Sequence, residues 1–114
     1  MATPRLNNLT IYVSQDEFAA NCEFYAAIFG DALFRGSDIM CFAAGAERAV
    51  CVHIEGELGR VSGEVEAIYW VDDLEAFRSD ATERGLRLED TGVGLQLVDP
   101  SGRRLRFISP PSET

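Results

Sequence analysis

The residue types that carry out most enzyme chemistry are scarce in this chain. Its ten basic residues are all arginine, and its single histidine is His53. Schiff-base chemistry and a Walker-type phosphate loop both need a lysine, so the sequence excludes them. An iron site of two histidines and one carboxylate, or a histidine-rich zinc site, cannot be built from one histidine. His53 is therefore the main candidate for acid–base chemistry near neutral pH.

The thiols are Cys22, Cys41 and Cys51. Their number is odd and none of them is part of a Cys-x-x-Cys pair, so the sequence predicts neither a disulfide framework nor a zinc ribbon. Such thiols are typical of a reduced compartment, which predicts a cytoplasmic protein. Because acidic neighbours raise the pKa of a thiol, we do not expect Cys51 to act as a nucleophile.

The composition is that of an acidic globular protein. The chain has 114 residues, of which 46% are hydrophobic, and 19 acidic against 10 basic residues give a net charge of −9. An acidic surface repels phosphate groups, so we expect neither nucleic acid nor a membrane as a partner. No apolar run follows the first five residues to make a signal peptide, and none approaches the roughly 20 residues of a membrane span. The length predicts a single domain over residues 1–114.

The elements that would position these residues occur in the same order twice. Residues 9–13 predict a strand, and a Ser-x-x-Glu capping box at 14–17 predicts a helix that stops at Gly30. Three extended runs follow, at 33–34, 39–43 and 50–54.

The second half repeats this plan, with a strand at 67–71, a capping-box pattern at 72–75 and a helix stop at Gly85. Three extended runs again follow, at 86–88, 94–98 and 105–108. The sequence thus predicts an α+β fold of two β-α-β-β-β modules, over residues 6–56 and 64–109, with a linker at about 57–63. A ferredoxin-like domain is the alternative, and the three strands after each helix count against it.

Three short motifs are similar to those of a known superfamily. Phe24-Tyr25 with Phe29-Gly30 resembles its "FY…LG" helix, Val71-Asp72-Asp73-Leu74 its "V-D-D" junction, and Asp99-Pro100-Ser101-Gly102 its "DP-x-G" hairpin. In this order the motifs resemble the glyoxalase, bleomycin-resistance and extradiol dioxygenase superfamily, also called vicinal oxygen chelate proteins. The resemblance covers nearly the whole chain and implies paired modules that form a curved mixed sheet, with the helices outside.

Metal-dependent members of that superfamily hold an ion at four inward positions, which the resemblance transfers to Asn8, Cys51, Glu66 and Arg106. A guanidinium stays protonated and repels a divalent cation, and an amide is a poor ligand for zinc, nickel or iron. We therefore predict no metal at these positions and no cofactor. A metal site formed by His53 with Glu55 and Glu66 is the remaining alternative.

Strand alternation then indicates which side chains line a small-molecule cleft. The resemblance implies that the first and last strands of a module are neighbours, so we expect an ion pair between Glu66 and Arg106. We also expect ligand stacking on the only tryptophan, Trp70. The predicted ligand-binding residues are Asn8, Tyr12, Phe42, Cys51, His53, Glu55, Glu66, Trp70, Arg104 and Arg106.

These patterns and the resemblance favour a metal-free binding protein of the antibiotic-sequestering, bleomycin-resistance type. Its ligand would be planar or cationic and held in a cleft at the interface of a homodimer. We expect the homodimer because exposed Trp70, Tyr12 and Phe42 would form a large apolar patch. The alternatives are a non-catalytic regulatory domain and an enzyme, a lyase, isomerase or dioxygenase-like protein with an atypical or absent metal site. In that enzyme the catalytic candidates are His53, as acid–base group, and Glu66, as its partner.

Overall fold

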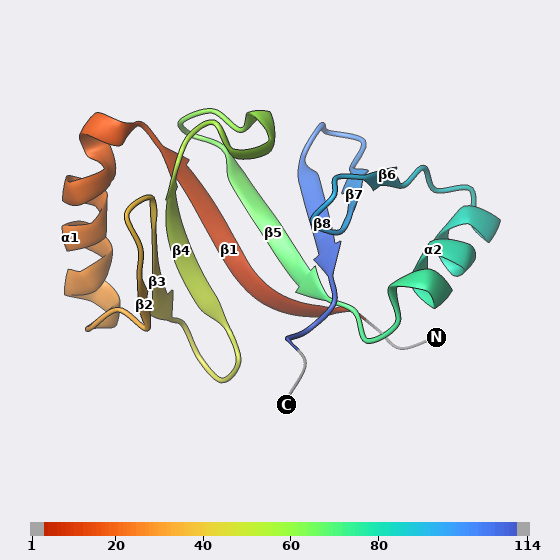
Figure 1. Ribbon diagram of the computed structural model, residues 1–114, viewed down its shortest axis with the longest axis horizontal. Coiled ribbons are helices and arrows are strands. Elements are labelled where there is room, and N and C mark those ends of the chain that lie inside the picture. Colours follow the sequence, from red (N-terminus) through yellow and green to blue (C-terminus); the bar gives the residue numbers. More distant parts are fainter. Residues whose placement is uncertain (1–3, 112–114) are drawn as a thin grey trace. The chain divides into compact units, whose positions relative to one another are not determined.

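A computed structural model describes residues 4–111 of the chain, which divide into two compact units (Figure 1). The first unit runs from Asn8 to Val65, and the second unit combines residues 4–7 with residues 66–111. Both follow the order β-α-β-β-β, so the predicted α+β fold of paired modules is confirmed. The ends of the predicted domain, residues 1–3 and 112–114, lie outside the described residues.

The first unit has the strand order β2-β3-β4-β1. Strand β1 is parallel to β4, whereas β3 is antiparallel to both β2 and β4. Two short 3₁₀ helices, η1 and η2, lie in the connections. The elements are β1 (Arg5–Val13), η1 (Gln15–Glu17), α1 (Phe18–Phe29), β2 (Phe34–Arg35), β3 (Ile39–Ala43), β4 (Ala49–Ile54) and η2 (Glu57–Gly59).

The second unit has the same arrangement, β5-β8-β7-β6, with β5 parallel to β8 and the other pairs antiparallel. Its first short strand, β6, lies at Glu89–Asp90, after the run at 86–88 that the sequence favoured. The elements are β5 (Val65–Trp70), α2 (Leu74–Glu83), β6 (Glu89–Asp90), β7 (Leu95–Val98) and β8 (Arg104–Ile108).

Each unit has its own hydrophobic core between its helix and one face of its strands. Helix α1, orange in Figure 1, packs against β3 and β4. In the second unit the rings of Phe77 on α2 and Phe107 on β8 lie 4.6 Å apart. The buried core residues are Val13, Cys22, Phe42 and Val52 in the first unit, and Val71, Phe77, Leu95 and Phe107 in the second.

The two helices begin differently. The Asp73 carboxylate accepts the backbone N–H of Ala76 at 3.0 Å and caps α2, one residue after Asp72, where the predicted capping box begins. The Ser14 hydroxyl instead donates to the Glu17 carboxylate at 2.9 Å and caps no backbone group, and a 3₁₀ turn precedes α1. The capping box predicted there is therefore wrong. No helix within residues 4–111 is long and apolar enough to cross a bilayer.

Candidate functional site

The strand register defines which side chains of the first unit point away from α1. Thr10 lies opposite Cys51 and Tyr12 opposite His53, and partners in a ladder point to the same face. Val13 and Val52, which have the opposite phase on these strands, pack in the core under α1. Tyr12, Cys51 and His53 therefore share the helix-free face, as the alternation predicted.

Phe42 does not lie on that face. It is opposite Val50 in the register, is 0% exposed and packs in the core with Val13 and Cys22. Its predicted place in the cleft is wrong, because the pairing with β4 fixes the phase of β3 and turns Phe42 towards α1.

Two further predicted cleft residues differ in exposure or direction from the expectation. Tyr12 is on the helix-free face but is 0% exposed, so it is no open wall. Glu55 lies after the last residue of β4, and its carboxylate accepts the backbone N–H of Ser62 at 2.9 Å. The alternation that placed Glu55 in the cleft ends with the strand at Ile54. Glu55 therefore orders the following loop.

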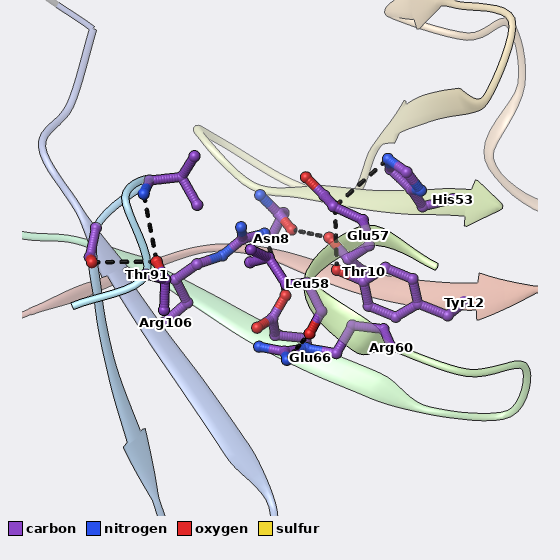
Figure 2. Close-up of polar contacts among 12 residues, drawn as sticks. Asn8, Thr10, Tyr12, His53, Glu57, Leu58, Arg60, Glu66, Thr91 and Arg106 are labelled. Atoms are coloured by element: carbon purple, nitrogen blue, oxygen red, sulfur yellow. Dashed lines mark hydrogen bonds and ion pairs between the residues drawn. The ribbon is translucent and has the colours of Figure 1, made fainter. Parts of the chain in front are cut away.

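A polar cluster surrounds His53 (Figure 2). The imidazole Nε2 lies 3.4 Å from a carboxylate oxygen of Glu57, and the Tyr12 hydroxyl donates to the same oxygen at 3.4 Å. The other ring nitrogen, Nδ1, is 2.6 Å from the carbonyl oxygen of Ile54. A carbonyl oxygen only accepts, so a hydrogen bond at this contact requires a proton on Nδ1. Both ring nitrogens of His53 contact protein oxygens. To act as a general acid or base on a ligand, Nε2 would have to give up its contact with Glu57.

The helix-free face of the second unit carries a buried ion pair. Arg106 Nη2 lies 3.1 Å from Glu66 Oε1, and the two side chains are 8% and 1% exposed (Figure 2). They come from neighbouring strands, since Arg106 is opposite Ile68 in the register of β5 and β8. The predicted ion pair is confirmed. Within residues 4–111, however, the buried Nε of Arg106 has no hydrogen-bond partner.

Beside this pair lies a buried amide that the sequence reading missed. Gln96 on β7 is opposite Arg106, is 7% exposed and donates to Glu89 at 3.1 Å. It alternates with Leu95 and Leu97, so a polar side chain between two apolar positions was the available signal.

The other predicted residues of the second unit lie on the same two strands. Trp70, two residues beyond Ile68 on β5, is half-buried and opposite Ile108. Arg104 is half-buried at the start of β8. The ring of Trp70 and the guanidinium of Arg106 thus lie on one face, one strand apart.

The expected linker also contributes two polar side chains to the first unit. Glu57 binds His53 and Tyr12, and Arg60 is 3% exposed, with Nη1 donating to the Leu58 carbonyl at 2.9 Å. Neither residue was predicted, because a Gly-rich polar segment gives no periodicity from which burial could be inferred.

The side chains at the four positions that the resemblance marks for a metal do not fit a divalent metal ion. The Glu66 carboxylate is bound by a guanidinium, and the Asn8 oxygen accepts the Thr10 hydroxyl at 2.7 Å. A hydrogen bond with Cys41 and burial both raise the pKa of the Cys51 thiol, which disfavours the thiolate form that a metal ion would need. Residues 4–111 also contain no cluster of three or more His, Cys, Asp or Glu side chains placed to hold a metal.

The first unit also has a groove on its helix side, with a volume of about 310 Å³. This volume lies at the lower end of the usual range for small-molecule pockets. The groove contains one carboxylate, Glu23, and one guanidinium, Arg35, and is otherwise apolar. Its lining residues are Phe18, Ala19, Cys22, Glu23, Ala26, Arg35, Met40 and Phe42.

Solved structures with the same fold are named as proteins of different kinds. An extradiol ring-cleaving dioxygenase from B. fuscum aligns with a TM-score of 0.69 at 13% identity over 96% of this chain, which spans only 33% of the dioxygenase. A glyoxalase/bleomycin resistance protein/dioxygenase superfamily member from Vibrio splendidus 12B01 aligns with a TM-score of 0.66 at 20% identity, over 95% of this chain and 100% of that protein. An NAD-dependent benzaldehyde dehydrogenase from Legionella pneumophila aligns with a TM-score of 0.68 at 15% identity, over 91% and 98%.

By sequence, no known protein family matches the chain and no curated protein is similar to it. The chain has the fold of the glyoxalase/bleomycin resistance protein/dioxygenase superfamily, as its motifs predicted. Identities of this size show the fold alone, and the same fold carries unlike activities.

Proposed function

We propose that the protein is a metal-free small-molecule-binding protein, similar in function to the sequestering proteins of the bleomycin-resistance type. The observation that carries the proposal is the Nε of Arg106, a buried donor for which the described residues 4–111 offer no hydrogen-bond acceptor. A buried polar group that lacks its hydrogen bond costs about 1–3 kcal/mol, which a ligand oxygen would recover. Glu66 holds the guanidinium in place, so the donor is already oriented before a ligand arrives.

The ligand class follows from the two side chains on this face. A carboxylate or carbonyl oxygen suits Arg106 Nε, and a planar ring suits stacking on half-buried Trp70. We therefore propose a planar aromatic ligand bearing an anionic or carbonyl oxygen. The binding face would be completed by a second copy of the chain in a cytoplasmic homodimer.

The exposed apolar side chains are not the ones from which the sequence indicated a dimer. Tyr12 and Phe42 are fully buried, so they form no exposed patch. Several large exposed apolar side chains of the first unit lie on α1 and just after it, among them Phe24 (61%), Ile28 (58%) and Leu33 (67%). A patch of this kind is typical of an interaction surface.

Fluorescence of the only tryptophan tests the binding function directly. The protein is titrated with a panel of planar aromatic carboxylates and with bleomycin, and saturable quenching of Trp70 is expected for the planar carboxylates. Arg106→Lys should weaken that binding at least about tenfold, because lysine has no fixed planar donor at the Nε position. Arg35→Ala, in the groove beside α1, is the matched control and should leave binding unchanged.

Three results would contradict the proposal. Binding that Arg35→Ala abolishes and Arg106→Lys preserves would place the ligand in the groove. A stoichiometric transition metal in the purified protein would favour the enzyme alternative, a lyase, isomerase or dioxygenase-like protein. Absence of binding across the panel would favour a regulatory domain.

A further inference from the structure

Two cysteines lie directly opposite each other on the helix-free face of the first unit. Cys41 on β3 and Cys51 on β4 are register partners in an antiparallel pair. Both are free thiols in the structure. Side chains of directly opposite residues project to the same face of a sheet, so the two sulfur atoms are on one side.

The backbone hydrogen bonds define which kind of pair the cysteines form. Ala44 N–H donates to the Arg48 carbonyl at 3.0 Å, and Ile54 N–H donates to the Asp38 carbonyl at 2.9 Å. These bonds mark hydrogen-bonded pairs beyond each end of the β3–β4 ladder. Because hydrogen-bonded and non-hydrogen-bonded pairs alternate, counting inward from either end makes the cysteines a non-hydrogen-bonded pair.

That pair type has the spacing a disulfide needs. Cα atoms of non-hydrogen-bonded antiparallel partners lie about 4.5 Å apart, and disulfides occur at Cα separations of about 4.4–6.8 Å. The bond could therefore form without moving the strands.

The two thiols have different surroundings, which gives them different roles. Cys41 is half-buried, whereas Cys51 is 4% exposed. A hydrogen bond with Cys51 lowers the pKa of Cys41, against the opposing effect of burial, while that hydrogen bond and burial raise the pKa of Cys51. Cys41 is thus the thiol that an external reagent meets first and that ionises more easily.

We propose that Cys41 and Cys51 are an oxidation site that takes low-molecular-weight disulfides as co-substrate and closes to a cross-strand disulfide. The Cys41 thiolate attacks one sulfur of the reagent, forms a mixed disulfide and releases one thiolate. The Cys51 thiol then loses its proton and attacks the Cys41 sulfur, which expels the second thiolate. The protein is oxidised by two electrons, the reagent is reduced to two thiols, and the two protons of the cysteines pass to these products.

Oxidised glutathione is the probe for this site. Reduced, folded protein is incubated with it and followed by intact-mass spectrometry and by peptide mapping without reductant. The expected product has lost two hydrogen atoms and yields a peptide in which Cys41 and Cys51 are linked. Far-UV circular dichroism should be unchanged, since the bond joins strands that are already paired.

Single variants separate the two steps. Cys51→Ser should stop at a stable glutathione adduct on Cys41, because the second thiol is missing. Cys41→Ser should react at least about tenfold more slowly, because only the buried thiol of higher pKa remains on this face. Cys22→Ala is the matched control and should still form the disulfide.

Other results would overturn the proposal. They are a link that includes Cys22, a link formed only in denaturant, or folded protein that stays fully reduced. A Cys51→Ser protein that forms no adduct would exclude Cys41 as the attacking thiol.

Discussion

Equivalent positions of the two units share one backbone plan and carry different chemistry. In the first unit Thr10 is opposite Cys51, and in the second Ile68 is opposite Arg106 in the same parallel register. The neutral Cys51 thiol therefore corresponds to the Arg106 guanidinium. Each lies on the helix-free face of its unit, and each is less than one-tenth exposed.

The two units therefore share the packing of their cores and differ in the polar side chains of their helix-free faces. Both cores consist of one helix on four strands, with an aromatic ring buried in each, Phe42 and Phe107. The helix-free faces differ, since one has a thiol pair and a His–Glu–Tyr cluster and the other a buried ion pair. The core face is set by the fold, so function has to be sought on the other face.

Truncation of the core aromatics should have the largest effect and should be equal in both units. Phe42→Ala and Phe107→Ala should each lower the free energy of unfolding by about 4 kcal/mol, because each leaves a cavity between helix and sheet. Urea denaturation followed by circular dichroism measures both. If Phe42→Ala cost under 1 kcal/mol and weakened ligand binding instead, Phe42 would belong to a cleft after all.

The helix-free faces should respond unequally to the same kind of change. Arg106→Ala should cost about 3 kcal/mol, because it removes the cation beside a carboxylate that is 1% exposed. Cys51→Ala, at the equivalent position, should cost only about 1 kcal/mol, since it removes one small neutral group. Equal losses of unfolding free energy in the two variants would show that the ion pair stabilises the fold no more than the neutral thiol does.

The helix starts offer a smaller contrast. Asp73→Ala should cost about 1 kcal/mol, because it removes the acceptor for the Ala76 N–H. Ser14→Ala should change the free energy of unfolding by less than about 0.5 kcal/mol, since its hydroxyl caps no backbone group. Thermal denaturation of the two variants side by side decides this, and a larger loss for Ser14→Ala would contradict the assignment.

The smallest expected effect is that of acid on the stability contributed by Asp99, in the hairpin between β7 and β8 of the second unit. Hydrogen bonds from the backbone of Arg103 and Ser101 lower the pKa of Asp99 from its usual 3.8. Because the folded pKa lies below the unfolded value, the contribution of Asp99 to stability is full above about pH 4 and is lost as pH falls through the folded pKa. Asp99→Asn should therefore be less stable than the unmodified protein at pH 7, by an amount that shrinks below pH 4. A difference that grows in acid would reverse the sign and exclude this mechanism.

The element plan of the fold could be predicted from short-range signals. An unbroken apolar run placed the strand at 39–43, and glycines at 30 and 85 ended both helices, each with a positive φ. Boundaries were less certain where tertiary contacts decide them. The capping box at Ser14 was not formed, and the short strand after α2 lies at 89–90, because two-residue edge strands have too few side chains to show a period.

The site could be predicted only where strand phase determines it. Alternation assigned the faces of Glu66 on β5 and Arg106 on β8, and the resemblance implied that these strands are neighbours. For Phe42, in contrast, the phase depended on the partner strand β4. Alternation also ended at Ile54 and could not place Glu55. The roles of Glu57 and Arg60 depend on how a loop folds back, which no local pattern encodes.

Strand β1 links the order of chain synthesis to the order of folding. The first unit is one continuous segment, Asn8–Val65, so all of its contacts become available as soon as that segment has been made. The second unit also needs the start of β1, where Arg5 forms a two-pronged ion pair with Asp72, 67 residues further along the chain. Closing so long a loop is entropically costly and slows folding. The first unit should therefore acquire its native contacts early during translation, and the second unit later.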